Sequence, residues 1–561
     1  MENKTMEENV EVTKNQEKPS KKKLFLGIGV LAVVIAICAI FGAKMENAIR
    51  KLISSPESYY QWLEQGVAEE TASNAAKFYE IYLEHMERAF DTGYKGELEV
   101  SLTEAGQNVV SLLTGIKQEQ LSWLESVSVI TAGTVKDTKA QSVIALELGQ
   151  DTIISLDAIV DYAKGMFVYL AIPQLSNQYM GLETGLTKEE VGLEQIRQLF
   201  AILQEQLPDS ETVEHMINRY LSVILKELNK VEKSSDILQV EHIAQKCTQL
   251  QVTVDKEIAE QVKKTILEQL RADEQLKTYV ISIVDAIKSA NISGFEVEKT
   301  GKQVYEDFIT SLTKAEQESL ETEYEKIVMT VFVDNDGTIM ARKVEIFNAE
   351  TITEFAVLTA REGKELVINA YVIPTKDGDR YELVGTGIID GSNIVGEFAV
   401  QYNGTEIVQV TVENLDIISS AKGYIDGHFT MQMPAVIENM IDSAYFANTL
   451  SELQIGLEIQ TGIDYSDVTV SLFNNEEKWF SIATITDICE AEEVVLPTNM
   501  IAMETKDDME VYWNSIQWDS FIAHLKQTSV NSEVISVLES LSKMTFTEVY
   551  FFAQIILSGI F

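Results

Sequence analysis

The most regular feature of the sequence is a series of turn signals between 327 and 412, which separates runs of β-branched and aromatic residues. The turn signals are Asn335-Asp336-Gly337, Glu362-Gly363, Asp377-Gly378, Asp390-Gly391 and Asn403-Gly404. Asn-Gly and Asp-Gly pairs favour the short turns of β-hairpins, because both residue types tolerate positive φ angles. The spacing therefore predicts an antiparallel meander of about seven strands.

Alternation of apolar and polar residues also occurs earlier, between 97 and 173. Leu98, Val100 and Leu102 alternate with polar residues, and similar runs follow. A strand with this pattern buries one face and exposes the other. We therefore predict half-buried antiparallel strands in this region. Three further strands are predicted at 454–460, 468–473 and 479–486.

Helical periodicity dominates the remaining long stretches. Ser55-Pro56-Glu57 predicts a helix that begins with proline at its first position and ends near residue 88. Apolar stripes at helical spacing fill 186–320, apart from a β-like stretch at 240–254. Each stripe gives a helix one apolar face, which must pack on a partner, and the simplest partner is the face of a predicted sheet. Further helices are predicted at 435–446, 515–526 and 532–552.

An apolar run without charges extends from Leu24 to Ala43, after three consecutive lysines. About twenty helical residues match the ~30 Å hydrocarbon layer of a membrane. The flank before the run carries Lys14, Lys18 and Lys21 to Lys23, and the flank after it carries Lys44, Arg50 and Lys51. The positive-inside rule therefore places the N-terminus in the cytoplasm. A cleaved signal is the main alternative, but Phe41 stands where a small residue is expected. A buried soluble helix is the other alternative.

These patterns predict an α+β fold with curved antiparallel β-sheet or sheets packed by amphipathic helices, and one N-terminal transmembrane helix. The predicted divisions of the chain are a disordered cytoplasmic tail at 1–23, the transmembrane helix at 24–43, a region at 44–320 with a helix, antiparallel strands and a helical block, and a meander with C-terminal helices at 321–561. The last two form either one ectodomain or two. The predicted location is the cell membrane, crossed once, with most of the chain extracytoplasmic.

The net charge of −44 limits the partners. Binding of nucleic acid depends on clustered Lys and Arg, so we exclude nucleic acid as a partner. The predicted partners are the membrane, through Leu24 to Ala43, and an apolar ligand, a peptide ligand or an envelope protein.

Residues that resemble enzyme or cofactor motifs do not have the spacing or order that those motifs require. The histidines lie far apart and none has the spacing of a zinc site. Ser311 to Lys314 matches S-x-x-K and Lys299-Thr300-Gly301 matches K-T-G, but their order is the reverse of that in penicillin-binding enzymes. Asp334 to Gly337 is better explained as a hairpin turn than as a calcium loop, because Phe332 occupies the first loop position. We predict no catalytic, cofactor-binding or metal-binding residues, and no enzyme.

Cys247 and Cys489 are the cysteines outside the apolar run. They are far apart in the sequence and do not form a disulfide framework by themselves. We expect two buried thiols, with pairing between them as the alternative.

Three short segments, at 55–60, 169–176 and 427–434, together with the apolar run, resemble uncharacterised single-pass extracytoplasmic proteins of Gram-positive bacteria. The combination of a strand meander and helices is also loosely similar to the curved half-barrel of LolA and LppX-type lipoprotein carriers. The resemblance implies a location and a fold, and it carries no site residues to this chain.

The sequence therefore predicts a membrane-anchored extracytoplasmic binding or interaction protein, with an apolar or peptide ligand between sheet and helices. The alternative is a structural or sensory envelope protein that acts through protein contacts. A ligand-binding protein predicts an apolar cavity beside the meander. An interaction protein predicts an exposed apolar patch instead.

Overall fold

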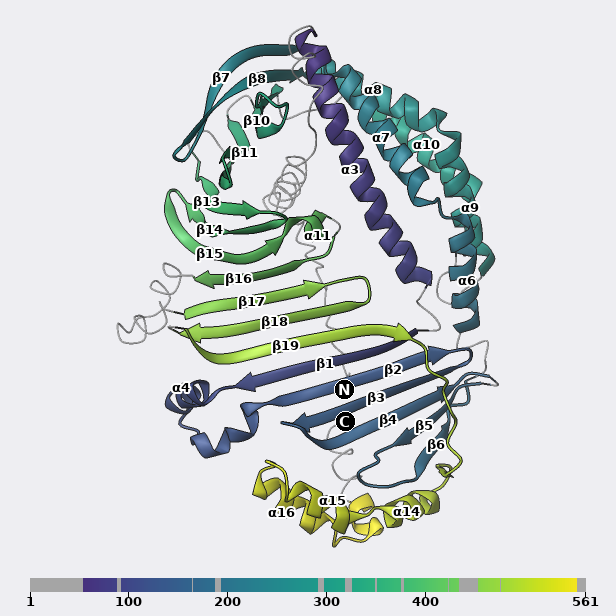
Figure 1. Ribbon diagram of the computed structural model, residues 1–561. Coiled ribbons are helices and arrows are strands. Elements are labelled where there is room, and N and C mark those ends of the chain that lie inside the picture. The colour runs from purple at the N-terminus through teal and green to yellow at the C-terminus, as the bar shows by residue number, and fades with distance from the viewer. Residues whose placement is uncertain are drawn as a thin grey trace, which may run out of the picture.

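The computed structural model describes residues 54–87, 92–163, 165–186, 193–290, 297–317, 325–348, 351–374, 378–421, 423–432, 453–474 and 476–551. All the strands in these ranges belong to one sheet of 20 strands (Figure 1). Neighbouring strands are antiparallel throughout, except that β20 pairs with β6 in parallel.

The first part of the sheet follows chain order. Its strands are β7 (Val231–Val240), β8 (Ile243–Asp255), β9 (Lys326–Val333), β10 (Ile339–Phe347), β11 (Ile352–Glu362), β12 (Glu365–Ile373), β13 (Tyr381–Asp390), β14 (Asn393–Tyr402), β15 (Thr405–Asp416), β16 (Asp426–Gln432), β17 (Leu453–Thr461), β18 (Tyr465–Asn474) and β19 (Glu477–Glu490). The predicted meander is confirmed by β9 to β15. At its last turn Asn403 and Gly404 both have positive φ, as a two-residue hairpin turn requires.

The second part of the sheet comes from earlier in the chain. Its strands are β1 (Thr92–Leu102), β2 (Val127–Lys136), β3 (Lys139–Leu148), β4 (Asp151–Asp161), β5 (Phe167–Ala171), β6 (Tyr179–Glu183) and, from near the C-terminus, β20 (Met500–Ala502). Strand β1 pairs with β2 on one side and with β19 on the other, from Thr92 opposite Glu490 to Leu102 opposite Phe480. This junction, which we call the β19–β1 seam, joins the two parts into one sheet.

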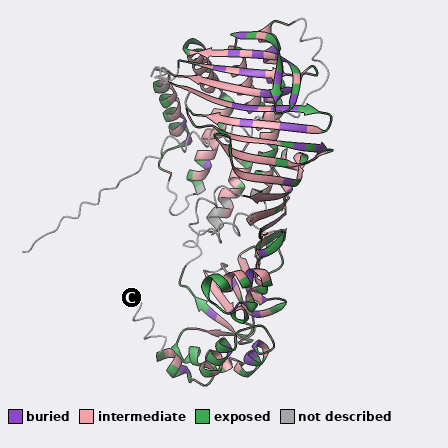
Figure 2. Cartoon of the chain, turned by 90° about the vertical axis from the view of Figure 1, so that its left-hand side faces the viewer, coloured by how far each residue is buried: buried purple, intermediate pink, exposed green. Residues whose placement is uncertain are grey.

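Six of the described helices lie on one side of the first part of the sheet (Figure 1). They are α3 (Pro56–Glu87), α6 (Leu193–Gln206), α7 (Ser210–Glu227), α8 (Lys256–Ala272), α9 (Glu274–Ala290) and α10 (Gly301–Gln317). Of the six, α3 and α8 contact strands and the others pack mainly on neighbouring helices. Figure 2, turned so that the left side of Figure 1 faces the viewer, shows the strands in front of these helices. The other helices are α4 (Glu104–Thr114), η1 (Gln118–Gln120), η2 (Ser122–Glu125), α11 (Ile417–Ala421), α14 (Lys506–Ser515), α15 (Trp518–Leu525) and α16 (Ser532–Leu541).

The buried side chains form separate cores along the sheet. In the largest core, Tyr59, Tyr60 and Leu63 of α3 pack against residues of β8 and β9, among them Leu250 and Val331. A second core lies inside a curl of the sheet, where β7 and β8 contact residues of β10, β11 and β12. At the far end, Leu148 packs with Phe521, Ile522 and Leu525 of α15. The sheet is therefore anchored by helices near both ends.

The structure contradicts one part of the predicted fold class, the transmembrane helix. No helix in the described ranges is long and apolar enough to cross a membrane. Helix α3 has 32 residues, but acidic residues recur along it because it packs with one apolar face on the sheet. The α+β character and the antiparallel sheet agree with the structure, which has one sheet where one or several were expected. The predictions of a single-pass membrane protein and of a signal anchor have no support from these helices.

Some predictions fall on positions outside the described ranges. They are the tail at 1–23, the apolar run from Leu24 to Ala43 and the short helix at 435–446. The predicted boundary at 320 and 321 separates strands that pair with each other, since β8 pairs with β9 and β19 pairs with β1.

Candidate apolar binding site

One face of the sheet can be followed by register from one helix-covered core to the other. Residues directly opposite on neighbouring strands point to the same face. Val331, which packs against α3, is thereby connected to Val357 of β11, to Leu472 of β18 and finally to Leu148, which packs against α15. The pairs that make this connection are Val331–Arg342, Arg342–Val357, Val357–Ala370, Ala370–Leu383, Leu383–Val400, Phe398–Val410, Val410–Met431, Met431–Ile455, Ile455–Leu472, Leu472–Phe480, Phe480–Leu102, Val100–Val127 and Val127–Leu148. We call this the inner face.

The inner face is apolar on almost every strand around the β19–β1 seam. Its apolar residues there are Ile455, Leu457, Val468, Val470, Leu472, Phe480, Ile482, Tyr94, Leu98, Val100, Val129, Ile144, Leu146, Leu156, Val168, Leu170, Met180 and Leu182. The opposite face, which we call the outer face, carries more polar residues at the same place. There Ser128 donates a hydrogen bond to Glu97 at 3.0 Å and Gln141 donates to Asp157 at 2.9 Å.

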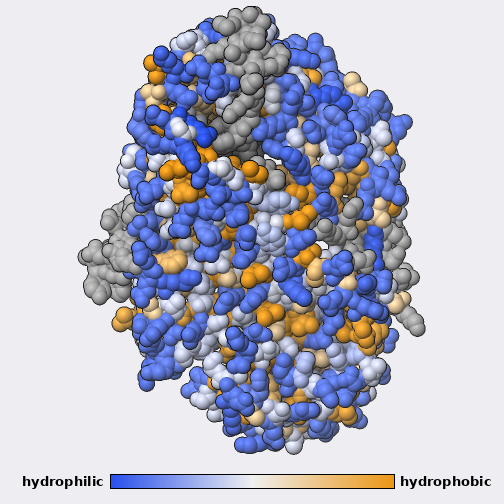
Figure 3. All heavy atoms as spheres, viewed as in Figure 1, coloured by the Kyte–Doolittle hydropathy of each residue, from blue (hydrophilic) through white to orange (hydrophobic). Residues whose placement is uncertain are grey.

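Many inner-face side chains around the seam stay in contact with solvent. Seven large apolar residues on β18, β19, β1, β3, β4 and β6 are between 36% (Ile482) and 46% (Ile144) exposed; the other five are Tyr94, Leu98, Leu156, Leu182 and Val470. In Figure 3, hydrophobic residues (orange) gather between the sheet and the helices. Monomeric proteins rarely leave a contiguous apolar surface of more than a few hundred Å² open, so such a surface indicates a place for a ligand or partner.

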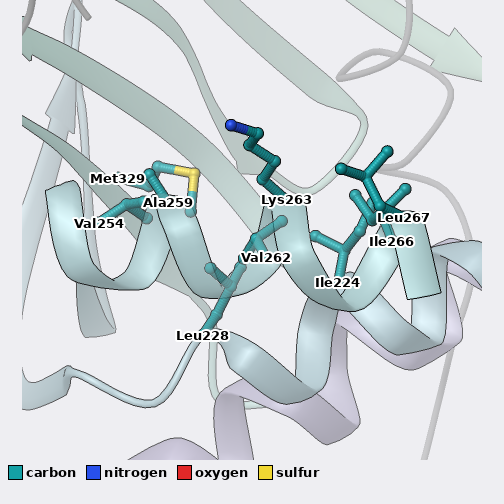
Figure 4. Close-up of a pocket in the computed structure, with 9 residues that line it drawn as sticks. All are labelled: Ile224, Leu228, Val254, Ala259, Val262, Lys263, Ile266, Leu267 and Met329. Carbon is teal, nitrogen blue, oxygen red and sulfur yellow. The ribbon is translucent and has the colours of Figure 1, made fainter. Parts of the chain in front are cut away.

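At the α3 end, the inner face forms the floor of a pocket with a volume of about 530 Å³ (Figure 4). Val254 and Met329 contribute from β8 and β9, and the walls come from α7 and α8. The wall residues are Ile224, Leu228, Ala259, Val262, Lys263, Ile266 and Leu267. Pockets that bind small molecules typically enclose ~300–1,000 Å³ and are lined mainly by apolar groups. This pocket has a volume and an apolar lining in that range, and it is largely open to solvent, so it is a groove and not an enclosed cavity.

Lys263 is the polar member of the pocket lining. Its side chain is 17% exposed and its Nζ lies 3.6 Å from Oε2 of Glu260, one turn earlier on α8. Figure 4 shows the amine pointing away from Ile224 and Leu228. The methylene stem therefore lines apolar space while the charged end lies at its border, as is usual for lysine.

Polar contacts at both ends of α8 hold the pocket walls in place. At the start of α8, the Asp255 carboxylate accepts a hydrogen bond from the Ile258 N–H at 3.1 Å and pairs with Lys230. At its end, Asp273 pairs with Arg219 and accepts a hydrogen bond from the Tyr220 hydroxyl at 2.7 Å. Burial and the Asp273 carboxylate raise the pKa of Tyr220, so this hydroxyl stays protonated and remains a donor.

Helix α3 is tied to the inner face by an ion pair between Glu64 and Arg342 of β10. Arg342 Nη1 lies 2.5 Å from Glu64 Oε1, and Nη2 lies 2.8 Å from Oε2, which is the two-pronged geometry of a strong Arg–carboxylate pair. Glu64 is buried. The pKa of the neighbouring Tyr60 is raised mainly by burial and, to a smaller extent, by the negative charge of the Glu64 carboxylate. This contact sets the position of α3 over the sheet.

The residues considered above as candidates for metal binding or catalysis lie far apart in the structure. His242 lies beside Glu365 at 3.0 Å, whereas His524 contacts the Thr152 carbonyl oxygen at 2.8 Å. Asp334 accepts hydrogen bonds from the backbone N–H groups of Asp336 and Thr338, which confirms the predicted hairpin turn. Across the ranges that the structure describes, no three His, Cys, Asp or Glu side chains are grouped so as to hold a metal.

The cysteines differ from the expectation of two buried thiols. Cys247 is buried in β8, but Cys489 is exposed in β19, near the β19–β1 seam. Strands β8 and β19 are not neighbours in the sheet.

Sequence reasoning placed Ile224, Leu228, Val262 and Ile266 on the apolar stripes of two helices, but it assigned no residue to a pocket and predicted no continuous apolar face. The alternating pattern was visible in β1 and β3, but it does not show which strands become neighbours. The i, i+3 and i+4 spacing of Ala259, Val262, Lys263 and Ile266 was a usable signal, since it places a lysine on the apolar stripe of α8.

No family model matches the chain, and no curated protein matches it. The resemblance to uncharacterised extracytoplasmic proteins of Gram-positive bacteria and to LolA and LppX-type carriers stays a prediction.

Proposed function

We propose that this protein is a non-catalytic binding protein that holds an apolar ligand between the inner face of the sheet and the helices. The observation that carries the proposal is the half-exposed apolar surface around the β19–β1 seam, which lies on the same face of the sheet as the floor of the α7–α8 pocket. Covering such side chains yields about 25 cal/mol for each Å² of apolar surface removed from water. The extracytoplasmic location stays a prediction.

Strand β19 offers a matched pair of variants to test this. Ile482 lies on the inner face opposite Val100, and Ile485 lies on the outer face opposite Glu97. Their exposures are similar, at 36% and 40%. Purified full-length protein and the variants Ile482→Glu and Ile485→Glu are titrated with a fluorescent probe for apolar sites, and native mass spectrometry records co-purified molecules.

Ile482→Glu is expected to weaken probe binding roughly tenfold or more, because a carboxylate is costly to bury beside an apolar ligand. Ile485→Glu should bind as the unmodified protein does. Equal binding by all three proteins, together with spectra free of adducts, would overturn the proposal.

A second candidate function, contact with an envelope protein partner, is favoured by the surface of α4. Leu112 is 86% exposed and Leu113 is 61% exposed, and Ile116 follows them after the helix. Exposed apolar residues grouped on one element are typical of an interaction surface. Replacement of Leu112 and Leu113 by serine should abolish such an interaction while leaving probe binding unchanged. Partner capture in a pull-down that the double variant loses would support this alternative.

A further inference from the structure

We infer that the ligand is a long-chain carboxylic acid whose acyl chain occupies the α7–α8 pocket and whose carboxylate pairs with the Lys263 ammonium. The inference rests on the proposed function and assigns the class of ligand. It distinguishes between the apolar and peptide ligands that the sequence left open.

The pocket lining favours an acyl chain over a peptide. Apart from Lys263, the lining side chains are Ile, Leu, Val, Ala and Met. A peptide would bring amide N–H and C=O groups into this space, and an amide buried without a hydrogen-bond partner is unfavourable. A hydrocarbon chain has no such groups.

Lys263 favours an acid over a neutral chain. Its stem lines the pocket, and its ammonium has three donor hydrogens, so a ligand carboxylate can join or replace the partners that it already has, of which Glu260 is one. The overall charge of −44 disfavours anions over most of the surface. An anionic head group therefore needs a local cation, and Lys263 places one beside the apolar α7–α8 pocket.

The adjacent lysine provides a matched control. Lys264 is the next residue on α8, its side chain is 58% exposed, and it pairs loosely with Glu268 at 3.9 Å. It does not line the pocket. Lys263→Gln and Lys264→Gln therefore remove the same charge from the same helix, and the first alone removes it from the pocket.

The experiment measures displacement of a fluorescent probe from the full-length protein by hexadecanoate and by hexadecan-1-ol. Lys263→Gln is expected to weaken hexadecanoate binding roughly tenfold, since the variant loses a charge-assisted hydrogen bond to the carboxylate. Hexadecan-1-ol should bind the variant as it binds the unmodified protein. Lys264→Gln should change neither affinity. Equal loss of hexadecanoate binding in both lysine variants would overturn the role of Lys263.

A pocket-filling variant separates this inference from the proposed function. Ala259→Phe places a ring where the chain would lie, and its thermal unfolding midpoint shows whether the fold is retained. We expect it to lose binding of both hexadecyl ligands. If Ile482→Glu abolishes binding and Ala259→Phe leaves it intact, the pocket assignment is wrong and the proposed function stands. If neither variant affects binding, both are wrong.

Discussion

At the scale of single residues, buried charges decide where helices sit on the sheet. Glu64 and Arg342 are distant in sequence, and their pairing fastens α3 to β10 beside the core that includes Tyr59 and Tyr60. A buried ion pair adds little net stability compared with apolar residues, but the loss of one partner leaves an uncompensated charge. The pair therefore acts mainly on the position of α3.

We predict that Arg342→Met lowers the free energy of unfolding by about 3–5 kcal/mol, because Glu64 keeps a buried charge without its partner. Adding Glu64→Leu to this variant should restore most of the loss. The exposed pair of Lys364 and Asp390 serves as the control, and Lys364→Met should cost no more than about 1 kcal/mol. Urea denaturation measures all four proteins. A double variant no more stable than Arg342→Met would contradict the interpretation.

The second residue-scale prediction concerns pH. The ion pair with Lys230 and the hydrogen bond from Ile258 hold the pKa of Asp255 below its usual range. A carboxyl with a lowered pKa in the folded state contributes stability that is complete above its unfolded pKa of about 3.9. That contribution is lost as pH falls through the folded pKa. Asp255→Asn should therefore lose less stability than the unmodified protein between about pH 5 and pH 2. Parallel losses, measured by denaturant midpoints, would contradict this.

At the scale of elements, the contact of α4 with β19 holds the β19–β1 seam in register. The Thr103 hydroxyl caps α4 by accepting a hydrogen bond from the Gly106 N–H, and it donates one to the Lys478 carbonyl at 2.6 Å. Gly106 lies against β19 so closely that a Cβ there would come 2.1 Å from the Trp479 carbonyl oxygen. The glycine is required by this close approach.

Two helical glycines test the point. Gly106→Ala should destabilise the protein and lower its thermal midpoint, because backbone atoms of β19 must move to admit the methyl group. Gly66 of α3 has open space around its Cβ position, so Gly66→Ala should stabilise the protein by about 0.5–1 kcal/mol. Scanning calorimetry of the two variants compares them directly. A stabilising effect of Gly106→Ala would show that α4 does not pack tightly on β19.

At the scale of the whole molecule, the sheet makes the two parts of the chain depend on each other. Two strands that precede residue 320 pair with strands that follow residue 325. Strand β1 pairs with β19, and β8 pairs with β9. A sheet interrupted at these pairs exposes strand edges and apolar faces, which favours aggregation.

We therefore predict that fragments 1–320 and 321–561 do not fold separately. Co-expressed, they should associate and elute together in size-exclusion chromatography with the circular dichroism spectrum of the intact protein. Each fragment expressed alone should aggregate. A cooperative thermal unfolding transition in either isolated fragment would show that the division at 320 is a true domain boundary.

The sequence by itself determined the local structure. Turn signals such as Asn403-Gly404 predicted the meander of β9 to β15, and Ser55-Pro56-Glu57 predicted the start of α3, because turn and cap conformations depend on neighbouring residues. Alternation in β1 also indicated that its two faces differ.

Only the tertiary structure decided which strands are neighbours. Alternation is the same whatever strand lies alongside, so nothing local predicts that β1 pairs with β19. That pairing gathers Leu98, Ile482 and Val470 on one face, and the packing of α8 over β8 and β9 places Lys263 at a pocket. The candidate site is built from long-range contacts, and for this reason it was invisible in a sequence whose helices and strands were largely predictable.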